Sequence, residues 1–179
     1  VAFSLPTFAA DETNTLGVLY SAVLNNETLN VSDQDQTVQM TLKTNKAVTL
    51  DGMGLTIVYD APIELVKIEG GDKIDIKASN YNMANGKVSW SSDDAENLND
   101  ITELLKVTFK VPAGTEAGSY RVGVKELELT KDYGTIWEPE ASAAATLTVV
   151  GDVHTEGYTA GLNTLNKEIH VDETVDVNI

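Results

Sequence analysis

Cysteine is absent from this chain of 179 residues, and histidine occurs only twice, at His154 and His170. Without thiols the chain can form no disulfide, thiolate zinc site, iron–sulfur cluster or cysteine nucleophile. Because both histidines lie near the C-terminus, a histidine-assisted serine nucleophile in the body of the chain has no base. This is a poor inventory for an enzyme, and we predict no catalytic residue, no bound metal and no cofactor.

Cations are scarce as well. Lys and Arg number 12 against 28 Asp and Glu, which gives a formal net charge of −16. A chain this acidic repels phosphate backbones and anionic lipid headgroups, so nucleic acid and membranes are unsuitable partners. No apolar run approaches the roughly 18 residues that a membrane span needs. Hydrophobic residues still make up 42% of the chain, which together with the length predicts one well-buried domain.

Composition divides the chain into three parts. Residues 1–14 include small residues at Ala9 and Ala10, which fit either the remnant of a secretory leader or a first strand. Residues 15–151 carry strand-like patterns. Residues 152–179 hold both histidines and scattered apolar residues. We interpret them as an acidic C-terminal extension or linker, with a late edge strand as the alternative.

Alternation of apolar and polar residues predicts a series of short strands. The pattern is clear at Gln36–Lys43 and again at Met53–Tyr59, where every second residue is apolar. Pro62 then ends the second strand, because proline lacks the donor that a ladder needs. Further strands are predicted at Gly17–Leu24, Ile63–Ile68, Lys87–Ser91, Val107–Val111, Tyr120–Leu129 and Ala143–Val150.

Asp94–Leu105 is the one helix-like stretch, because Leu98, Ile101 and Leu105 recur near helical spacing. It is interpreted as one or two helical turns, or as a loop. Short strands with turn punctuation and at most one short helix predict an all-β chain, folded as an antiparallel β-sandwich.

Four motifs in family order resemble a cohesin, the scaffoldin module of cellulosome-forming anaerobic bacteria. They are Gly54–Pro62 (GLTIVYDAP), Asn85–Trp90 (NGKVSW), Leu105–Pro112 (LKVTFKVP) and Gly118–Val122 (GSYRV). The resemblance covers residues 15–151. It implies a jelly-roll sandwich of about nine strands that binds a dockerin, has no catalytic activity and leaves calcium to the dockerin partner.

The resemblance also implies where the dockerin binds. In the family one flat sheet face receives the dockerin helices, and the strand before the Tyr-Asp turn helps to form that face. The clostridial type carries polar residues where Gly52 and Gly54 stand here, which favours a divergent specificity such as the ruminococcal type. The residues carried over as partner-binding are Gly52, Gly54, Thr56, Val58, Ser89, Ser91, Asp93 and Asp94.

Physical reasoning supports a platform of this kind. A sandwich buries one face of each sheet and leaves the other face free. Glycine, Thr56, Val58 and the serines form a low surface on which a helix can lie. Asp93, Asp94 and Glu96 then form an acidic rim that affects orientation and association rate more than affinity.

The carboxylates between Asp93 and Glu103 have several interpretations. A solvated acidic loop is the first, a partner rim the second, and catalysis or metal binding the third. Asp33 with Asp35 and Asp72 with Asp75 lack the rest of a calcium loop, which favours a turn-stabilising role. Trp90 is in phase with Val88 and is predicted to be buried, whereas Trp137 is the better candidate for an exposed aromatic ring.

The sequence therefore predicts a secreted, extracellular or cell-surface docking module that is a monomer on its own. Two alternatives stay open, namely a carbohydrate-binding module and a structural sandwich domain of a bacterial surface protein. An exposed line of aromatic rings favours the first alternative, but aromatic residues make up only 6% of the chain.

Overall fold

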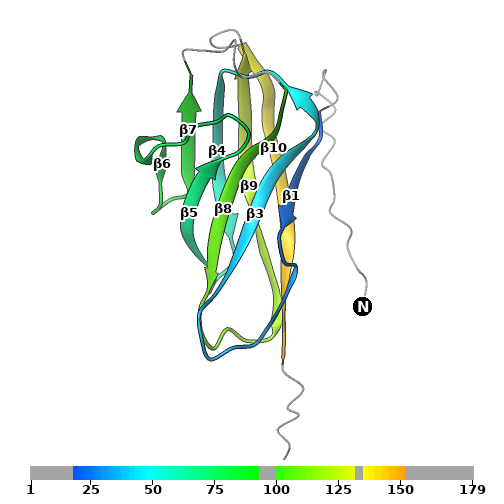
Figure 1. The fold of residues 1–179 in the computed structure, drawn as a ribbon, viewed down its shortest axis with the longest axis vertical. Coiled ribbons are helices and arrows are strands. Elements are labelled where there is room, and N and C mark those ends of the chain that lie inside the picture. Colours follow the sequence, from blue (N-terminus) through cyan, green and yellow to red (C-terminus); the bar gives the residue numbers. More distant parts are fainter. Residues whose placement is uncertain (1–17, 93–99, 132–134, 152–179) are drawn as a thin grey trace, which may run out of the picture.

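The computed structural model describes residues 18–92, 100–131 and 135–151, which form two β-sheets packed face to face (Figure 1). One sheet has four strands in the order β1-β3-β8-β5, and the other has six in the order β2-β10-β9-β4-β7-β6. Pairing is antiparallel except between β2 and β10, which run parallel. The strands are β1 (Tyr20–Leu24), β2 (Thr28–Asn30), β3 (Gln36–Val48), β4 (Gly52–Tyr59), β5 (Glu64–Gly70), β6 (Tyr81–Asn82), β7 (Lys87–Ser91), β8 (Ile101–Val111), β9 (Gly118–Lys131) and β10 (Thr135–Val150).

This arrangement confirms the predicted β-sandwich, with ten strands in the described part of the chain. Most connections carry the chain from one sheet to the other, as a jelly roll requires. Within the same part, the helical structure is one 3-10 turn, η1 (Ala78–Asn80). The segments 1–17, 93–99, 132–134 and 152–179 lie outside the described residues, and so do the predictions made for the two ends.

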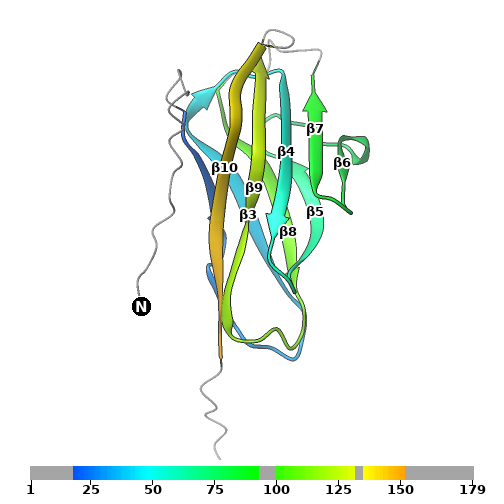
Figure 2. The same cartoon turned by 180° about the vertical axis from the view of Figure 1, so that it is seen from behind.

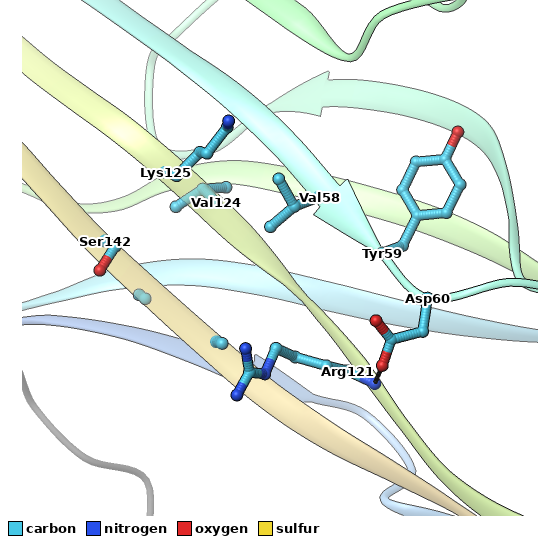
Figure 3. Close-up of a pocket in the computed structure, with 9 residues that line it drawn as sticks. Val58, Tyr59, Asp60, Arg121, Val124, Lys125 and Ser142 are labelled. Atoms are coloured by element: carbon cyan, nitrogen blue, oxygen red, sulfur yellow. Dashed lines mark hydrogen bonds between the residues drawn. The ribbon is translucent and has the colours of Figure 1, made fainter.

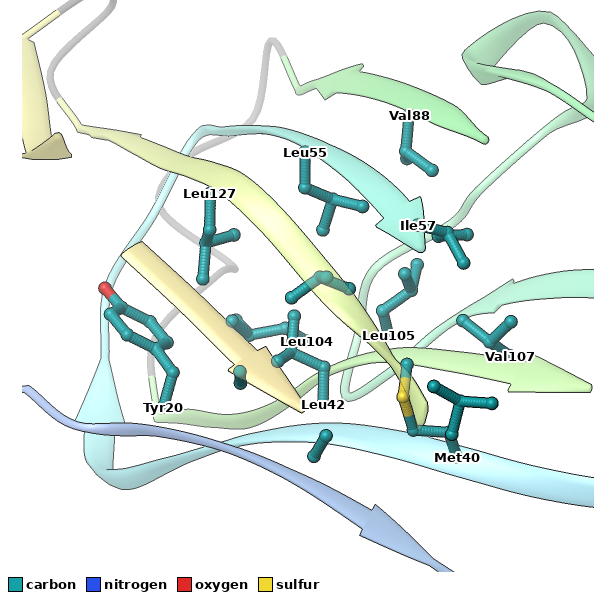
Figure 4. Packing of buried hydrophobic residues seen from close by; sticks show 14 of the residues in the cluster. Tyr20, Met40, Leu42, Leu55, Ile57, Val88, Leu104, Leu105, Val107 and Leu127 are labelled. Atoms are coloured by element: carbon teal, nitrogen blue, oxygen red, sulfur yellow. The ribbon is translucent and has the colours of Figure 1, made fainter. Parts of the chain in front are cut away.

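The core lies between the sheets and follows from the alternation seen in the sequence (Figure 4). β3 turns Val38, Met40 and Leu42 inward, and each is at most 1% exposed. Trp90 is buried at 7% exposure, as predicted from its phase with Val88. Each fully buried aliphatic side chain contributes about 1.5–3 kcal/mol, so the inner faces of the strands stabilise the sandwich.

The prediction of helical structure over Asp94–Leu105 is wrong for its described part, because Ile101–Val111 is the strand β8. Leu105 pairs with Leu42 while Glu103 pairs with Lys43, so Leu104 is an extra residue in the β8 ladder. The irregularity buries Leu104 and Leu105 together. This breaks the period of two and mimics helical spacing.

A tight turn between β6 and β7 sets the start of the strand that pairs with β4. Gly86 has φ +70°, and a Cβ there would collide with the backbone carbonyl oxygen of Ile57. Because the turn lies this close to β4, the Ile57 amide can donate a hydrogen bond to the Gly86 carbonyl at 2.8 Å. Glycine is therefore required both for the turn and for its contact with β4.

Candidate functional site

The predicted partner-binding strands lie side by side in the six-stranded sheet, whose outer surface faces the viewer in Figure 2. β4 pairs with β7 so that Gly54 faces Ser89, and it pairs with β9 so that Val58 faces Gly123. Ser89 and Ser91 are exposed, while Thr56 and Val58 are half-buried. The outward residues of β4, β7 and β9 thus share one water-facing surface, which we call the open face.

The two glycines of β4 differ in what covers them. Around Gly54 a Cβ would meet no atom within 4 Å, so this position lies in open space on the surface. Gly52 is in the same phase but is buried, because the side chain of Thr130 occupies the space above it. The Thr130 hydroxyl donates to Asp51 Oδ1 at 2.8 Å, which holds it there. Gly52 therefore adds little to the open face beyond its backbone.

Asp93 and Asp94, the predicted acidic rim, lie outside the described residues, as does the side chain of Trp137. Their placement on a partner-binding surface stays a prediction. The described part of the open face is defined by its neutral centre at Gly54, Thr56 and Ser89 and by the charged residues of β9.

Those charged residues were not predicted from the sequence. Between the Thr56–Lys125 pair and the Gly54–Glu128 pair, β9 contains one residue more than β4. This bulge leaves both Lys125 and Glu126 exposed, and Glu126 adopts φ +54°. The Thr56 hydroxyl donates to Glu126 Oε2 at 2.9 Å. A bulge re-aims side chains and breaks the period of two, so alternation alone could not place Glu126.

A shallow hollow of about 410 Å³ lies on the open face where β4, β9 and β10 meet (Figure 3). Gly123 lies between Val58 of β4 and Ala144 of β10 in the strand register. A Cβ at Gly123 would collide with the backbone of β10, so glycine is needed for the two strands to approach. Arg121 and Lys125 line opposite ends of the hollow, and the Arg121 side chain extends over β10.

The outer surface of the four-stranded sheet has a different electrostatic character. Its lysines Lys43, Lys67, Lys106 and Lys110 are paired with carboxylates on the same strand or on a neighbouring one. Lys43 and Lys106 both contact Glu103, at 3.0 and 3.1 Å, and together they lower the pKa of that carboxyl. On the open face, by contrast, neither Arg121 nor Lys87 forms an ion pair within the described part of the chain.

Two of the aspartates considered as calcium ligands, Asp72 and Asp35, instead accept hydrogen bonds that hold the fold together. Asp72 Oδ2 accepts bonds from the Thr102 amide, the Thr102 hydroxyl and the Glu103 amide at 3.0–3.1 Å. These bonds lower the pKa of Asp72. Asp35 accepts from the Ala113 amide at 2.9 Å. Among the described residues, no three side chains of metal-binding type gather, and none of the helical structure there has the length and apolarity of a membrane span.

Comparison with known proteins agrees with this architecture. The chain superposes on the third ScaB cohesin of R. flavefaciens, solved in complex with a group 1 dockerin, with a TM-score of 0.51 and 19% identity, covering 73% of this chain and 95% of that one. It also superposes on the cohesin module of a family 33 glycoside hydrolase from Clostridium perfringens, with a TM-score of 0.52 and 10% identity, covering 74% and 98%. Among curated proteins no sequence matches significantly. The family model described as "Cohesin domain" matches residues 11–135, and this chain therefore belongs to the cohesin family.

Proposed function

We propose that this cohesin is a non-catalytic docking module that binds a dockerin through the open face. The observation that carries the proposal is the low, water-facing centre at Gly54, Thr56 and Ser89, which lies on a sheet backed by the core. The cohesin family match and the dockerin bound to the R. flavefaciens cohesin support this partner.

The surface is suited to a helical partner. With no side chain at Gly54 and short side chains at Ser89 and Ser91, a helix can approach the sheet closely. Interfaces concentrate their energy in a few central residues that the rim shields from water. In this proposal calcium belongs to the dockerin. The assembly is an extracellular polysaccharide-degrading complex of the cellulosome type.

Isothermal titration against a panel of dockerins, with and without a chelator, tests the proposal. We expect at least one dockerin to bind in the presence of calcium. Its binding should be lost when a chelator removes the calcium. Gly54→Arg should reduce binding at least about a hundredfold, because a long side chain at the centre of an interface holds the partner away from it. Since a Cβ at Gly54 meets open space, the variant should still fold.

Val66→Arg is the matched control. Val66 is 49% exposed on β5, in the other sheet, so the same arginine there should leave binding unchanged. Equal binding by both variants would place the dockerin elsewhere on the chain. Absence of binding to every dockerin of the panel would refute the proposed function.

The carbohydrate-binding alternative is less well supported by the described residues. Trp90 is buried. Among the described residues, Tyr59 is the aromatic side chain with large exposure, and the centroid of its ring lies 5.7 Å from that of Phe109. It therefore packs against the core and does not form part of an exposed line of rings. Affinity electrophoresis on soluble polysaccharides separates the two functions. We expect no retardation of the wild-type chain.

A further inference from the structure

Charge is segregated along the open face. Arg121 and Lys125 project from β9 on either side of the hollow, and Lys87 lies opposite Thr56 on β7. In the bulge and just after it, the exposed charged residues of β9 are Glu126 and Glu128. Asp60 also lines the hollow, and its Oδ2 accepts from the Arg121 backbone amide at 2.7 Å. Along β7 and β9 the exposed charged residues change from cations at one end of the open face to carboxylates at the other, with the neutral Gly54 and Ser89 beside the carboxylate end.

We propose that this charge strip fixes the direction in which the dockerin lies across the face. A carboxylate side chain of the dockerin enters the hollow between Arg121 and Lys125, and a basic side chain lies over Glu126 and Glu128. The inference rests on the proposed function and adds the chemistry and polarity of the partner.

The hollow is suited to a carboxylate on an aliphatic stem. Val58 and Ala144 give it apolar walls, and two cations flank it. The carboxylate of Asp60 also lines it, but its Oδ2 is already engaged by the Arg121 amide. Arg121 and Lys125 are four residues apart on a strand, about 13 Å at the usual rise, so both long side chains can incline toward one carboxylate above Gly123. Arg121 has no ion-pair partner among the described residues, and Lys125 has Glu126 at 3.7 Å. Their positive charge is available to a partner at little cost.

The bulge supplies the opposite end. It leaves Glu126 exposed beside Lys125 at φ +54°, a conformation that costs energy for a residue with a side chain and tends to persist at functional sites. Complementary charge at both ends favours one docking direction. The reverse direction places like charges together, which disfavours it.

Charge reversal tests the strip, using the dockerin of the panel that binds most tightly. Arg121→Glu with Lys125→Glu should weaken binding about tenfold or more at low salt, and the loss should shrink in about 0.5 M NaCl. The control, Lys67→Glu with Lys77→Glu, changes the net charge equally at exposed sites away from the hollow. It should bind like the wild type.

Direction is measured with spin labels, which is straightforward because the chain has no cysteine. One label is placed at Ala47→Cys, which is exposed near the end of β3 and off the open face, and the other at Thr146→Cys, beside Arg121 on β10. Each label alone should broaden the NMR signals of a different end of the dockerin. Adding Glu126→Lys and Glu128→Lys to the double reversal inverts the strip, and it should exchange the two broadening patterns. Broadening of both dockerin ends from one label would overturn the inference.

The outcomes separate the inference from the proposed function. If Gly54→Arg abolishes binding but the reversals match the control, the charge strip has no role and the docking function stands. If no dockerin binds the wild type, both fall. Sedimentation of the wild type as a dimer that the reversals dissociate would identify a second copy of this chain as the occupant, which also overturns the inference.

Discussion

Asp72 shows how one carboxylate oxygen can hold two distant parts of the sandwich together. Its Oδ2 receives three donors from Thr102 and Glu103, thirty residues further along the chain. The sequence predicts a turn-stabilising role for this residue type. It could not identify the partners, because they are set by the sheet register and not by local spacing.

Replacing Asp72 by Asn should destabilise the fold by about 1–3 kcal/mol at neutral pH, since bonds to a charged acceptor are lost. The folded state lowers the pKa of Asp72. Its stabilisation is therefore complete above the unfolded pKa and is lost as the pH falls through the folded pKa. Urea unfolding at several pH values should show the variant and the wild type converging in acid.

Asp75→Asn is the control for this measurement. The Asp75 side chain is 81% exposed and lies 3.6 Å from Lys77, so its loss should change stability by less than about 0.5 kcal/mol. A gap between wild type and Asp72→Asn that stays constant down to the lowest pH would contradict the assigned role of the charge.

Strands were predictable even where they contain a bulge, as Tyr120–Leu129 of β9 shows, but the direction of the side chains across a bulge was not. β4 and β7 keep one apolar face over their paired region, as β3 does as far as Leu42. The open face was predicted from β4 and β7 for that reason. The extra residues Leu104 in β8 and Glu126 in β9 shift the phase. One shift mimicked a helix, and the other concealed the charged residues of the site. Each depends on pairing with a distant strand.

The bulge in β9 also allows a test of backbone energy. Glu126→Ala and Glu126→Gly both remove the bond to Thr56, but only glycine adopts φ +54° without steric cost. We expect the glycine variant to be more stable than the alanine variant by about 1 kcal/mol, measured by denaturant unfolding. Equal stability of the two variants would mean that this residue does not hold a left-handed conformation in solution.

The whole molecule places its charge unevenly on the two outer surfaces. The four-stranded sheet interleaves Lys with Glu, as where Lys110 contacts Glu64 at 2.7 Å. The chain as a whole carries −16. Exposed ion pairs contribute only about 0–1 kcal/mol each, whereas like charges throughout a compact chain repel one another. Repulsion should therefore outweigh local pairing.

Salt should consequently stabilise this protein. Raising NaCl from about 0.01 to about 0.5 M shortens the screening length from about 30 Å to less than 8 Å, which weakens repulsion more than it weakens contacts near 3 Å. We expect Tm to rise in thermal unfolding followed by circular dichroism. Lys67→Glu changes the net charge from −16 to −18, so its Tm should rise further with salt than that of the wild type. A Tm that falls with salt would show that cross-strand pairs such as Lys110–Glu64 outweigh the repulsion, because those contacts are what screening would then be removing.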